Sequence, residues 1–328
     1  MEIIARVGLG DGSLAFPHPP TLCLRADGSV LAVVTVQVDG VFGLALVHVT
    51  TAGEVASVTL PEGAFGAQPV IVDRGAAGVV VLVDDQTAVV TDSGLGNAET
   101  VPIAGTEAVS EHGRRLTAGG IARPAADGSW TVILSDPVAF QNARTIASFR
   151  IADGIPIWQG ASLLHGSEFP MAGGRTTTAP GGAKAPIVGD VVDVDGTRYA
   201  AAQGSDTMSL LKYGSDFFTL AALDDGGHVT RRLYEESGWK KTPGKHGIRA
   251  RFTTDGTSAI LTPVFRSGEW KGRQRLVDLE TGALREVPTV RGAAGFALVD
   301  LRGELALLAS DSEVLLVRGL LGAGPNAA

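Results

Sequence analysis

The feature that most constrains the fold is a short turn that recurs along the chain. Asp-Gly followed by Ser or Thr separates two apolar runs at residues 27–29, 127–129, 195–197 and 255–257. Asp-Gly in this setting is a strong hairpin signal, because glycine readily adopts the positive φ that such turns require. A second turn follows each first glycine after 25 to 31 residues, which leaves room for two strands and their connection. Another apolar strand follows that turn, so each unit predicts four antiparallel strands, named A to D in chain order.

The repeated units follow one another along almost the whole chain. The first five predicted units span about residues 21–60, 68–103, 117–158, 187–234 and 248–287. The last unit, residues 294–318, has three strands, and the Gly- and Pro-containing tail at 319–328 is not expected to add a fourth. The first strand, residues 2–9, has no hairpin partner. We therefore expect it to pair antiparallel with residues 314–318 and to complete the last unit.

The composition supports short strands and tight turns. Hydrophobic residues make up 45% of the chain, mostly Val, Ala and Leu in short runs broken by Asp and by many of the 44 glycines. Such runs favour strands that bury an apolar core. With these repeats, the chain resembles the six-bladed β-propeller superfamily over essentially its whole length. The resemblance implies one all-β domain, residues 1–328, whose last blade is closed by the N-terminal strand so that the closure leaves no free sheet edge. It implies no particular activity.

Net charge, cysteine content and hydropathy indicate the cellular compartment of the protein and limit the kinds of partner that it can bind. The formal net charge of −8 disfavours nucleic acid as a partner. The single cysteine, Cys23, cannot form an intrachain disulfide, which fits a reducing compartment. The N-terminus shows no signal-peptide pattern, and no run reaches the ~18 apolar residues of a membrane span. We expect a soluble cytoplasmic protein without a membrane partner; membership of a larger particle stays open.

The predicted connections divide the ring into two unequal faces. In a propeller the D-to-A and B-to-C connections emerge on one face, the top, and the A-to-B and C-to-D turns emerge on the other, the bottom. The predicted bottom turns are short, whereas the top face carries long D-to-A loops at 10–20, 105–116, 159–186 and 235–247. Elaborated loops on one side of a regular scaffold are typical of a binding surface. The sequence therefore predicts a functional top face.

Histidines gather in these predicted top loops. Of the six histidines, four fall in D-to-A connections: His18, His112, His165 and His246. Chance placement would put only about one there, because these loops hold roughly a fifth of the chain. Neutral imidazole is the commonest metal ligand, so the four histidines predict a site for a divalent transition metal. No tight motif such as HxH or HExxH accompanies them, and the alternative that they coordinate nothing stays open.

A second predicted site combines basic and aromatic residues on the top face above the fourth and fifth units. Basic side chains can hold carboxylates or phosphates, and tryptophan faces stack on sugar rings. An anionic ligand, an acidic sugar among them, a partner protein and plain solvated loops all remain open for this region. The candidate ligand-binding residues are Arg115, Trp239, Lys240, Lys241, Lys245, Arg249, Trp270, Lys271 and Arg273.

Two functions follow from these patterns. The favoured one is a recognition or scaffold module that binds a partner protein or an anionic ligand through its top loops, including a subunit of a viral or secretion assembly. The alternative is a metal-dependent lyase or hydrolase acting on an acidic carbohydrate, with Arg115, Lys245 and Arg249 holding the substrate carboxylate. Nucleophilic catalysis has little support: there is no GxSxG motif, and Cys23 lies in an apolar run that predicts an inert inner strand. The sequence leaves open whether the protein is an enzyme.

Overall fold

A computed structural model of the chain shows an all-β protein. The structure describes residues 1–9, 12–14, 19, 21–61, 69–84, 86–104, 117–118, 123–124, 129–135, 143–152, 154–165, 187–204, 217–224, 227–237, 248–263 and 272–322. The helical content of these residues is one 3-10 turn, η2 (Gly75–Ala77). Within the same residues, no helix has the length and apolar character needed to cross a membrane.

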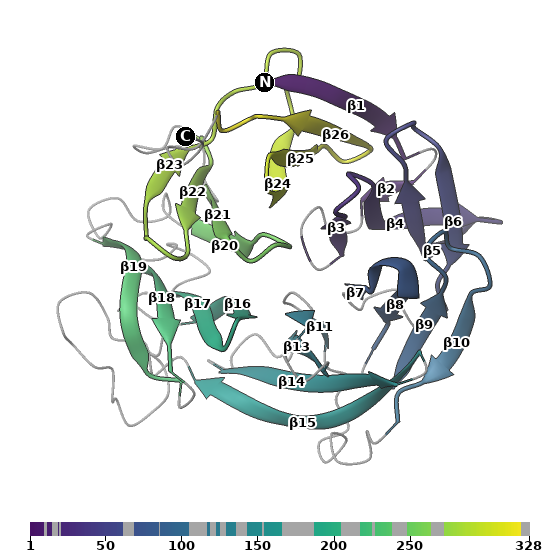
Figure 1. Ribbon diagram of the computed structural model, residues 1–328, viewed down its shortest axis with the longest axis horizontal. Coiled ribbons are helices and arrows are strands. Elements are labelled where there is room, and N and C mark those ends of the chain that lie inside the picture. Colours follow the sequence, from purple (N-terminus) through teal and green to yellow (C-terminus); the bar gives the residue numbers. More distant parts are fainter. Residues whose placement is uncertain are drawn as a thin grey trace.

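The described strands form six antiparallel sheets that follow one another around a common centre (Figure 1). The first sheet contains β2 (Ser13–Leu14), β3 (Leu22–Leu24), β4 (Val30–Val38), β5 (Val41–Val49) and β6 (Val55–Thr59). The second contains β7 (Val70–Asp73), β8 (Val79–Leu82), β9 (Thr87–Thr91) and β10 (Glu99–Pro102). The third contains β11 (Thr117–Ala118), β12 (Arg123–Pro124), β13 (Ser129–Ser135), β14 (Ala143–Ala152) and β15 (Ile155–His165).

The second half of the ring repeats the same order from the inner strand to the outer strand. The fourth sheet contains β16 (Ile187–Val194), β17 (Thr197–Gly204), β18 (Phe217–Leu223) and β19 (Val229–Ser237). The fifth contains β20 (Ile248–Phe252), β21 (Ser258–Pro263), β22 (Arg275–Asp278) and β23 (Leu284–Glu286). The sixth contains β24 (Ala297–Arg302), β25 (Leu305–Ala309), β26 (Glu313–Arg318) and β1 (Glu2–Gly8). The predicted all-β propeller class is confirmed.

The N-terminal strand closes the last sheet, as the sequence predicts. β1 pairs antiparallel with β26, from Glu2 opposite Arg318 to Gly8 opposite Glu313, and the two strands lie together in Figure 1. Arg6 adds an ion pair with Glu313 at 2.8 Å on the outer surface. The first and last strands of the chain therefore share one sheet, and the pairing joins the two ends of the ring without a covalent bond.

Apolar layers between neighbouring sheets form the core of the described residues. In β4, the side chains of Val30, Ala32 and Val34 pack with the sixth sheet, whereas those of Leu31 and Val33 pack with the second. Successive side chains of a strand point to opposite faces, so an unbroken apolar run fills two inter-sheet layers at once. The apolar runs in the sequence follow from this packing, and the core is a series of layers between adjacent sheets.

The recurrent Asp-Gly turns form the predicted A-to-B hairpins. In the first, the Asp27 carboxylate accepts the Ser29 backbone N–H at 2.8 Å and the Ser29 hydroxyl at 2.6 Å, while Gly28 has φ of 82°. In the fourth sheet, Asp195 and Gly196 both have positive φ, 49° and 78°, as a two-residue primed turn requires. The carboxylate and the glycine explain why this pair recurs. The turn at 127–129 is described only from residue 129 onward.

Three strands differ from the sequence prediction, and the first is β19, which runs to Ser237 and so enters the predicted loop at 235–247. β15 continues to His165, although the prediction ended it at Trp158, because an irregularity opposite Ser148 absorbs one residue and pairing with β14 then resumes at Gly160. His165 is therefore the last residue of a strand, and its predicted place within a loop is wrong. β2 lies inside the predicted loop at 10–20, because β4 is much longer than β3 and its far half is left to pair with β2.

Candidate functional site

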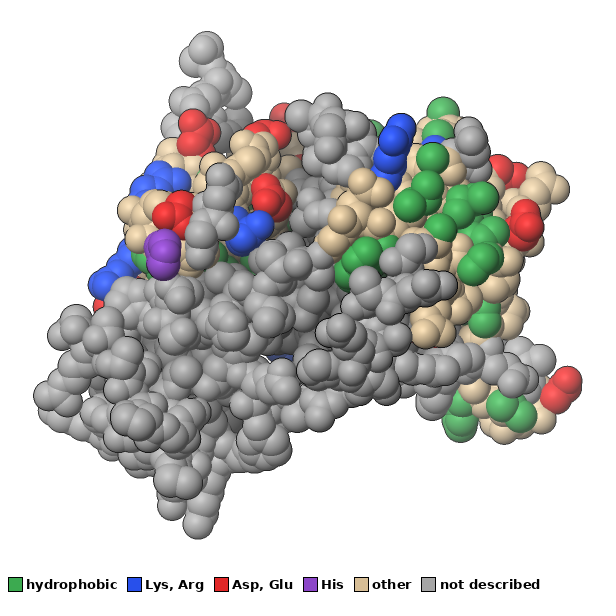
Figure 2. Space-filling view, turned by 90° about the horizontal axis from the view of Figure 1, so that it is seen from below, with side chains coloured by type: hydrophobic (Ala, Val, Ile, Leu, Met, Phe, Trp, Pro, Cys, Tyr) green, Lys and Arg blue, Asp and Glu red, His purple; other side chains and the backbone are tan. Residues whose placement is uncertain are grey.

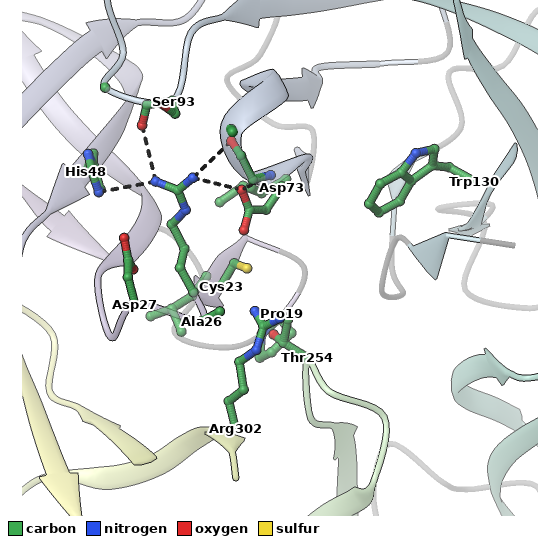
Figure 3. A pocket seen from close by; sticks show the side chains of 16 residues that line it. Pro19, Cys23, Ala26, Asp27, His48, Asp73, Ser93, Trp130, Thr254 and Arg302 are labelled. Atoms are coloured by element: carbon green, nitrogen blue, oxygen red, sulfur yellow. Dashed lines mark hydrogen bonds and ion pairs between the residues drawn. The ribbon is translucent and has the colours of Figure 1, made fainter. Parts of the chain in front are cut away.

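A cavity of about 590 Å³ opens near the ring centre (Figure 3). Its wall combines the C-terminal ends of inner strands with the bottom turns that follow them, and it includes residues of the first, second, third, fifth and sixth sheets. The volume lies within the range of about 300–1,000 Å³ that is typical of small-molecule sites. The cavity is on the bottom face, whereas the sequence predicted a site on the top face. The predicted top-face site stays a prediction, because most of its loops lie outside the described residues.

Arg25, just after the inner strand β3, is held on one side of the cavity by groups from two sheets. Its Nη2 lies 3.2 Å from Asp73 Oδ1 and donates to the Gly75 carbonyl at 3.3 Å. Its Nη1 donates to the Ser93 carbonyl at 3.2 Å, as the dashed lines of Figure 3 show. The side chains of Arg25 and Asp73 are only 8% and 14% exposed, so this ion pair is largely shielded from water. A desolvated pair with added hydrogen bonds is a structural unit, and loss of one partner would leave a buried charge.

His48, on β5, lies beside this pair as a neutral imidazole. Its Nε2 is 3.5 Å from Arg25 Nη1. A guanidinium can only donate, so Nε2 accepts and the imidazole proton is on Nδ1. Burial and the positive charge of Arg25 both lower the pKa of His48. The imidazole therefore adds no charge to the cavity at neutral pH.

Asp300, on β24, joins three inner strands behind the cavity wall. Its side chain is fully buried and accepts the backbone N–H groups of Leu24 at 3.0 Å and of Leu301 at 2.8 Å. Thr254 donates its backbone N–H at 2.7 Å and its hydroxyl at 2.5 Å. Burial raises the pKa of Asp300 to about 6, and the four donors act against that rise. The carboxylate links the first, fifth and sixth sheets and has no hydrogen-bonding capacity left for a ligand.

Arg302, at the end of β24, is the second guanidinium of the cavity and is much less constrained than Arg25. Figure 3 shows its side chain reaching toward Pro19 and Thr254. Its hydrogen bond within the described residues is one donation from Nη1 to the Leu24 carbonyl at 3.3 Å. No carboxylate of the described residues forms an ion pair with it, so most of its N–H groups are left to other acceptors.

The cavity wall also contains the single cysteine. Cys23 is a free, buried thiol on β3. Burial, followed by the charges of Asp300 and Asp73, raises the pKa of the thiol. The thiol therefore stays protonated at neutral pH and is a poor nucleophile. Among the described residues there is also no group of three or more His, Cys, Asp or Glu side chains that could hold a metal ion.

Three of the residues proposed from the sequence lie within the described part of the chain. Arg249 is an exposed residue of the inner strand β20, and partial desolvation together with the charge of Arg251 lowers its pKa. Arg273 is exposed and forms an ion pair with Glu286 of β23, so its charge is already partnered. His165 ends β15. The structure brings neither Arg249 nor Arg273 into the cavity.

The other proposed residues lie outside the described part of the chain, and their grouping stays a prediction. They are His18, His112, His246, Arg115, Trp239, Lys240, Lys241, Lys245, Trp270 and Lys271.

The basic region that contains many of these residues is mixed in charge where the structure describes it. On the outer strand β19, Arg232 pairs with Glu235 at 2.9 Å, and Arg231 donates to the carbonyls of Glu280 and Leu279 at 2.6 and 2.9 Å. Figure 2 shows arginine side chains interleaved with acidic ones at its left, on the side where Figure 1 places the fourth sheet. The arginines described on this strand are thus engaged with the protein itself.

Sequence reasoning missed the cavity residues Arg25, Asp73, Trp130 and Arg302. Three of them share a signal, because each is a charged residue at or just beyond the end of an inner strand, one to three positions before the glycine of an A-to-B turn. Strand ends at that position converge on the axis in a ring of sheets. Comparing these positions across the repeats would have placed the charges together. Trp130, near the start of β13, carries no such signal.

Comparison with known proteins gives no family. No family model matches the chain, and no curated protein matches it. Among solved structures, a protein from Lactobacillus plantarum is 13% identical, with 93% of this chain and 90% of that chain covered and a TM-score of 0.42. YCF48 from Cyanidioschyzon merolae is 10% identical, with 93% and 98% covered and a TM-score of 0.43. The β-propeller domain of Cps50 (Swd1) from Myceliophteria thermophila is 7% identical, with 97% and 99% covered and a TM-score of 0.39.

These TM-scores are all below 0.5, so the likenesses carry no argument about this chain. The class of protein rests on its own topology. A ring of antiparallel sheets, with the N-terminal strand paired into the last of them, defines a β-propeller, and this one has a ligand-sized cavity on its bottom face.

Proposed function

We propose that this β-propeller is a recognition module that binds a ligand carrying negative charge in the cavity, without transforming it. The main support for this proposal is a cavity of ligand size whose wall contains the guanidinium of Arg302. Among the described residues, this guanidinium has no carboxylate partner. In this proposal each of the six sheets is one blade, and residues 1–328 form a single six-bladed domain with a tail at 319–328. The proposal also keeps the predicted top loops as a binding surface for a partner protein.

The chemistry of the cavity wall supports binding over catalysis. A nucleophile or a general base needs a suitable pKa and a geometry that leaves it free to react. The thiol of Cys23 is buried with a raised pKa, and the carboxylate of Asp73 is bonded to Arg25 and to the Gly75 N–H. His48 lies against Arg25 through its acceptor nitrogen. These groups hold one another in place, which suits a rigid site for recognition.

Calorimetry and thermal melting of the purified full chain test the proposal. Small organic anions should bind and raise the melting temperature, neutral analogues of the same shape should bind less, and mass spectrometry should recover each ligand unchanged. Recovery of a converted ligand would contradict a purely binding function. Equal binding of anions and neutral analogues would contradict the role of charge.

The alternative of a metal-dependent lyase or hydrolase acting on an acidic carbohydrate depends on His18, His112, His165 and His246. Three of these lie outside the described residues, so the metal site stays a prediction. Elemental analysis of protein purified without chelator tests it, with His112→Ala and His246→Ala as the informative variants. Stoichiometric metal that is lost in these variants would support the alternative. A cytoplasmic location and membership of a particle also stay predictions.

A further inference from the structure

We propose that Arg302 is the anion-binding residue of the cavity and that the ligand is a small organic acid with one carboxylate and an apolar body. This inference rests on the proposed function and names its ligand class. Three observations lead to it: Arg25 and Arg302 differ in how many hydrogen-bond partners they have, the wall has a particular charge balance, and the wall has an apolar surface opposite Arg302.

The two arginines of the cavity differ in how many of their N–H groups are already hydrogen-bonded within the protein. Arg25 meets an aspartate, two backbone carbonyls and an imidazole, and its side chain is almost fully buried. Arg302 makes one hydrogen bond, to the Leu24 carbonyl at 3.3 Å, among the described residues. The carboxylate of Asp300 forms no ion pair with it, and four neutral donors already take up the hydrogen-bonding capacity of that group. A guanidinium with a free edge matches the two oxygens of a carboxylate, which it can hold by two parallel hydrogen bonds.

The charged groups of the cavity wall favour a ligand with one negative charge over a ligand with two. Among the described residues, the lining contains two guanidiniums, of Arg25 and Arg302, and two carboxylates, of Asp27 and Asp73. Burial acts to raise the pKa of Asp27, but hydrogen bonds from Ser29 and the charge of Arg25 outweigh it, so this carboxylate is ionised at neutral pH. A monocarboxylate adds a single negative charge, and Arg302 can pair with it. A phosphate dianion would add a second negative charge, and the described residues of the wall hold no further cation to receive it.

The wall also contains apolar side chains and the indole ring of Trp130. Leu22, Ile71 and Ala76 contribute aliphatic surface, and Trp130 extends from the third sheet on the side away from Arg302 in Figure 3. An indole offers both a broad apolar face and a preference for offset or edge contacts with another ring. A ligand bound at Arg302 through its carboxylate would therefore direct an apolar or aromatic body toward Trp130. The volume of about 590 Å³ accommodates a molecule of this kind.

Calorimetric titration of the full chain with 3-phenylpropanoate, 3-phenylpropanamide and phenyl phosphate tests the inference. The acid should bind about 10- to 100-fold more tightly than the amide, which has the same body without the charge. Phenyl phosphate should bind more weakly than the acid. Quenching or enhancement of tryptophan fluorescence by the acid should be reduced in a Trp130→Phe variant, which locates the ligand in this cavity.

Variants of Arg302 test whether its guanidinium binds the carboxylate of the ligand. Arg302→Gln should weaken binding of the acid by about 10- to 100-fold and leave binding of the amide unchanged. Arg302→Lys, which keeps the charge but loses the planar fork, should show an intermediate loss. Arg291→Gln, with the same charge change at an exposed position outside the cavity, should bind the acid as the parent does. Thermal melting of each variant shows whether it is folded. If a variant does not fold, the comparison of the acid with the amide in the parent protein still tests the inference.

The outcomes separate this inference from the function on which it rests. Tighter binding of phenyl phosphate than of the acid overturns the choice of a monocarboxylate but leaves anion recognition standing. Unchanged binding of the acid in a folded Arg302→Gln variant overturns the assignment of Arg302 alone. Equal affinity for acid and amide, or binding of none of the three probes, overturns both the inference and the proposed function.

Discussion

The carboxylate of Asp300 accepts the backbone N–H of Leu24 at 3.0 Å, across 276 positions of sequence. This hydrogen bond ties the innermost strand of the sixth sheet to that of the first, near the axis of the ring. On the outer surface, the pairing of β1 with β26 joins the same two ends of the chain. The ring is therefore closed twice, by a buried carboxylate on the inside and by a shared sheet on the outside.

Removal of the first nine residues should abolish cooperative folding. The deletion exposes the unpaired edge of β26, together with the apolar surface that Ile4, Ala5 and Val7 cover in the core. An open apolar edge promotes association between chains. We expect light scattering to rise and the sharp melting transition by circular dichroism to disappear. Arg6→Ala is the control: it removes an exposed ion pair with Glu313 and a contact with the Phe296 ring but leaves the strand in place, and it should keep the sharp melting transition. A truncated chain that melts like the full one would contradict closure by β1.

Replacement of Asp300 by Asn should destabilise the ring and change how its stability depends on pH. The amide N–H₂ would face the N–H of Leu24, and a buried donor left without an acceptor costs about 1–3 kcal/mol. Urea denaturation at pH 7 measures the loss, with Asp311→Asn at an exposed turn as the control.

The pH dependence follows from the raised pKa of Asp300. Burial raises the folded-state pKa to about 6, above the ordinary value of 3.8 that an aspartate has in an unfolded chain. Between these values the folded state binds more protons, so the free energy of unfolding should fall as pH rises from about 4 to 6 and then level off. The Asp300→Asn variant should lack this fall when the two proteins are compared over the same pH range. Parallel pH profiles would show that Asp300 does not titrate in this window.

Replacement of Arg25 by Met should destabilise the protein strongly. The change leaves the carboxylate of Asp73 without its cation and the carbonyls of Gly75 and Ser93 without their donor. Breaking a largely buried ion pair in this way costs about 3 kcal/mol or more. Arg74→Met, the neighbouring arginine outside the cavity wall, is the matched control. Equal urea midpoints for the two variants would show that the Arg25 cluster contributes little to stability.

Cys23 should resist alkylation in the folded protein. Burial raises the pKa of the thiol, and both low exposure and low thiolate content slow its reaction. Iodoacetamide at pH 8 should leave the native chain unmodified and should add one label after unfolding in urea, as the chain has a single cysteine. Intact mass spectrometry reads the outcome directly. Rapid labelling of the native chain would contradict the burial of Cys23.

Local sequence was sufficient for most of the strands and their order. The Asp-Gly turns at Asp27 and Asp195 are recognisable because a carboxylate and a glycine satisfy the turn within a few residues. The end of β15 was placed too early, because the irregularity that lets it continue past Trp158 depends on pairing with β14. A strand boundary set by a partner strand carries no signal of its own in the sequence.

The sequence by itself determined the repeat of four strands and the need for β1 to complete the last sheet, because these depend on turns and apolar runs of short range. It could not distinguish the two arginines of the cavity, since Arg25 and Arg302 each lie at or just beyond the end of an inner strand. Only the tertiary structure brings Asp73 to within 3.2 Å of Arg25 and leaves Arg302 with one backbone acceptor among the described residues. Hydrogen bonds and ion pairs act over a few ångströms, so their partners are decided by the folding of distant segments onto one axis.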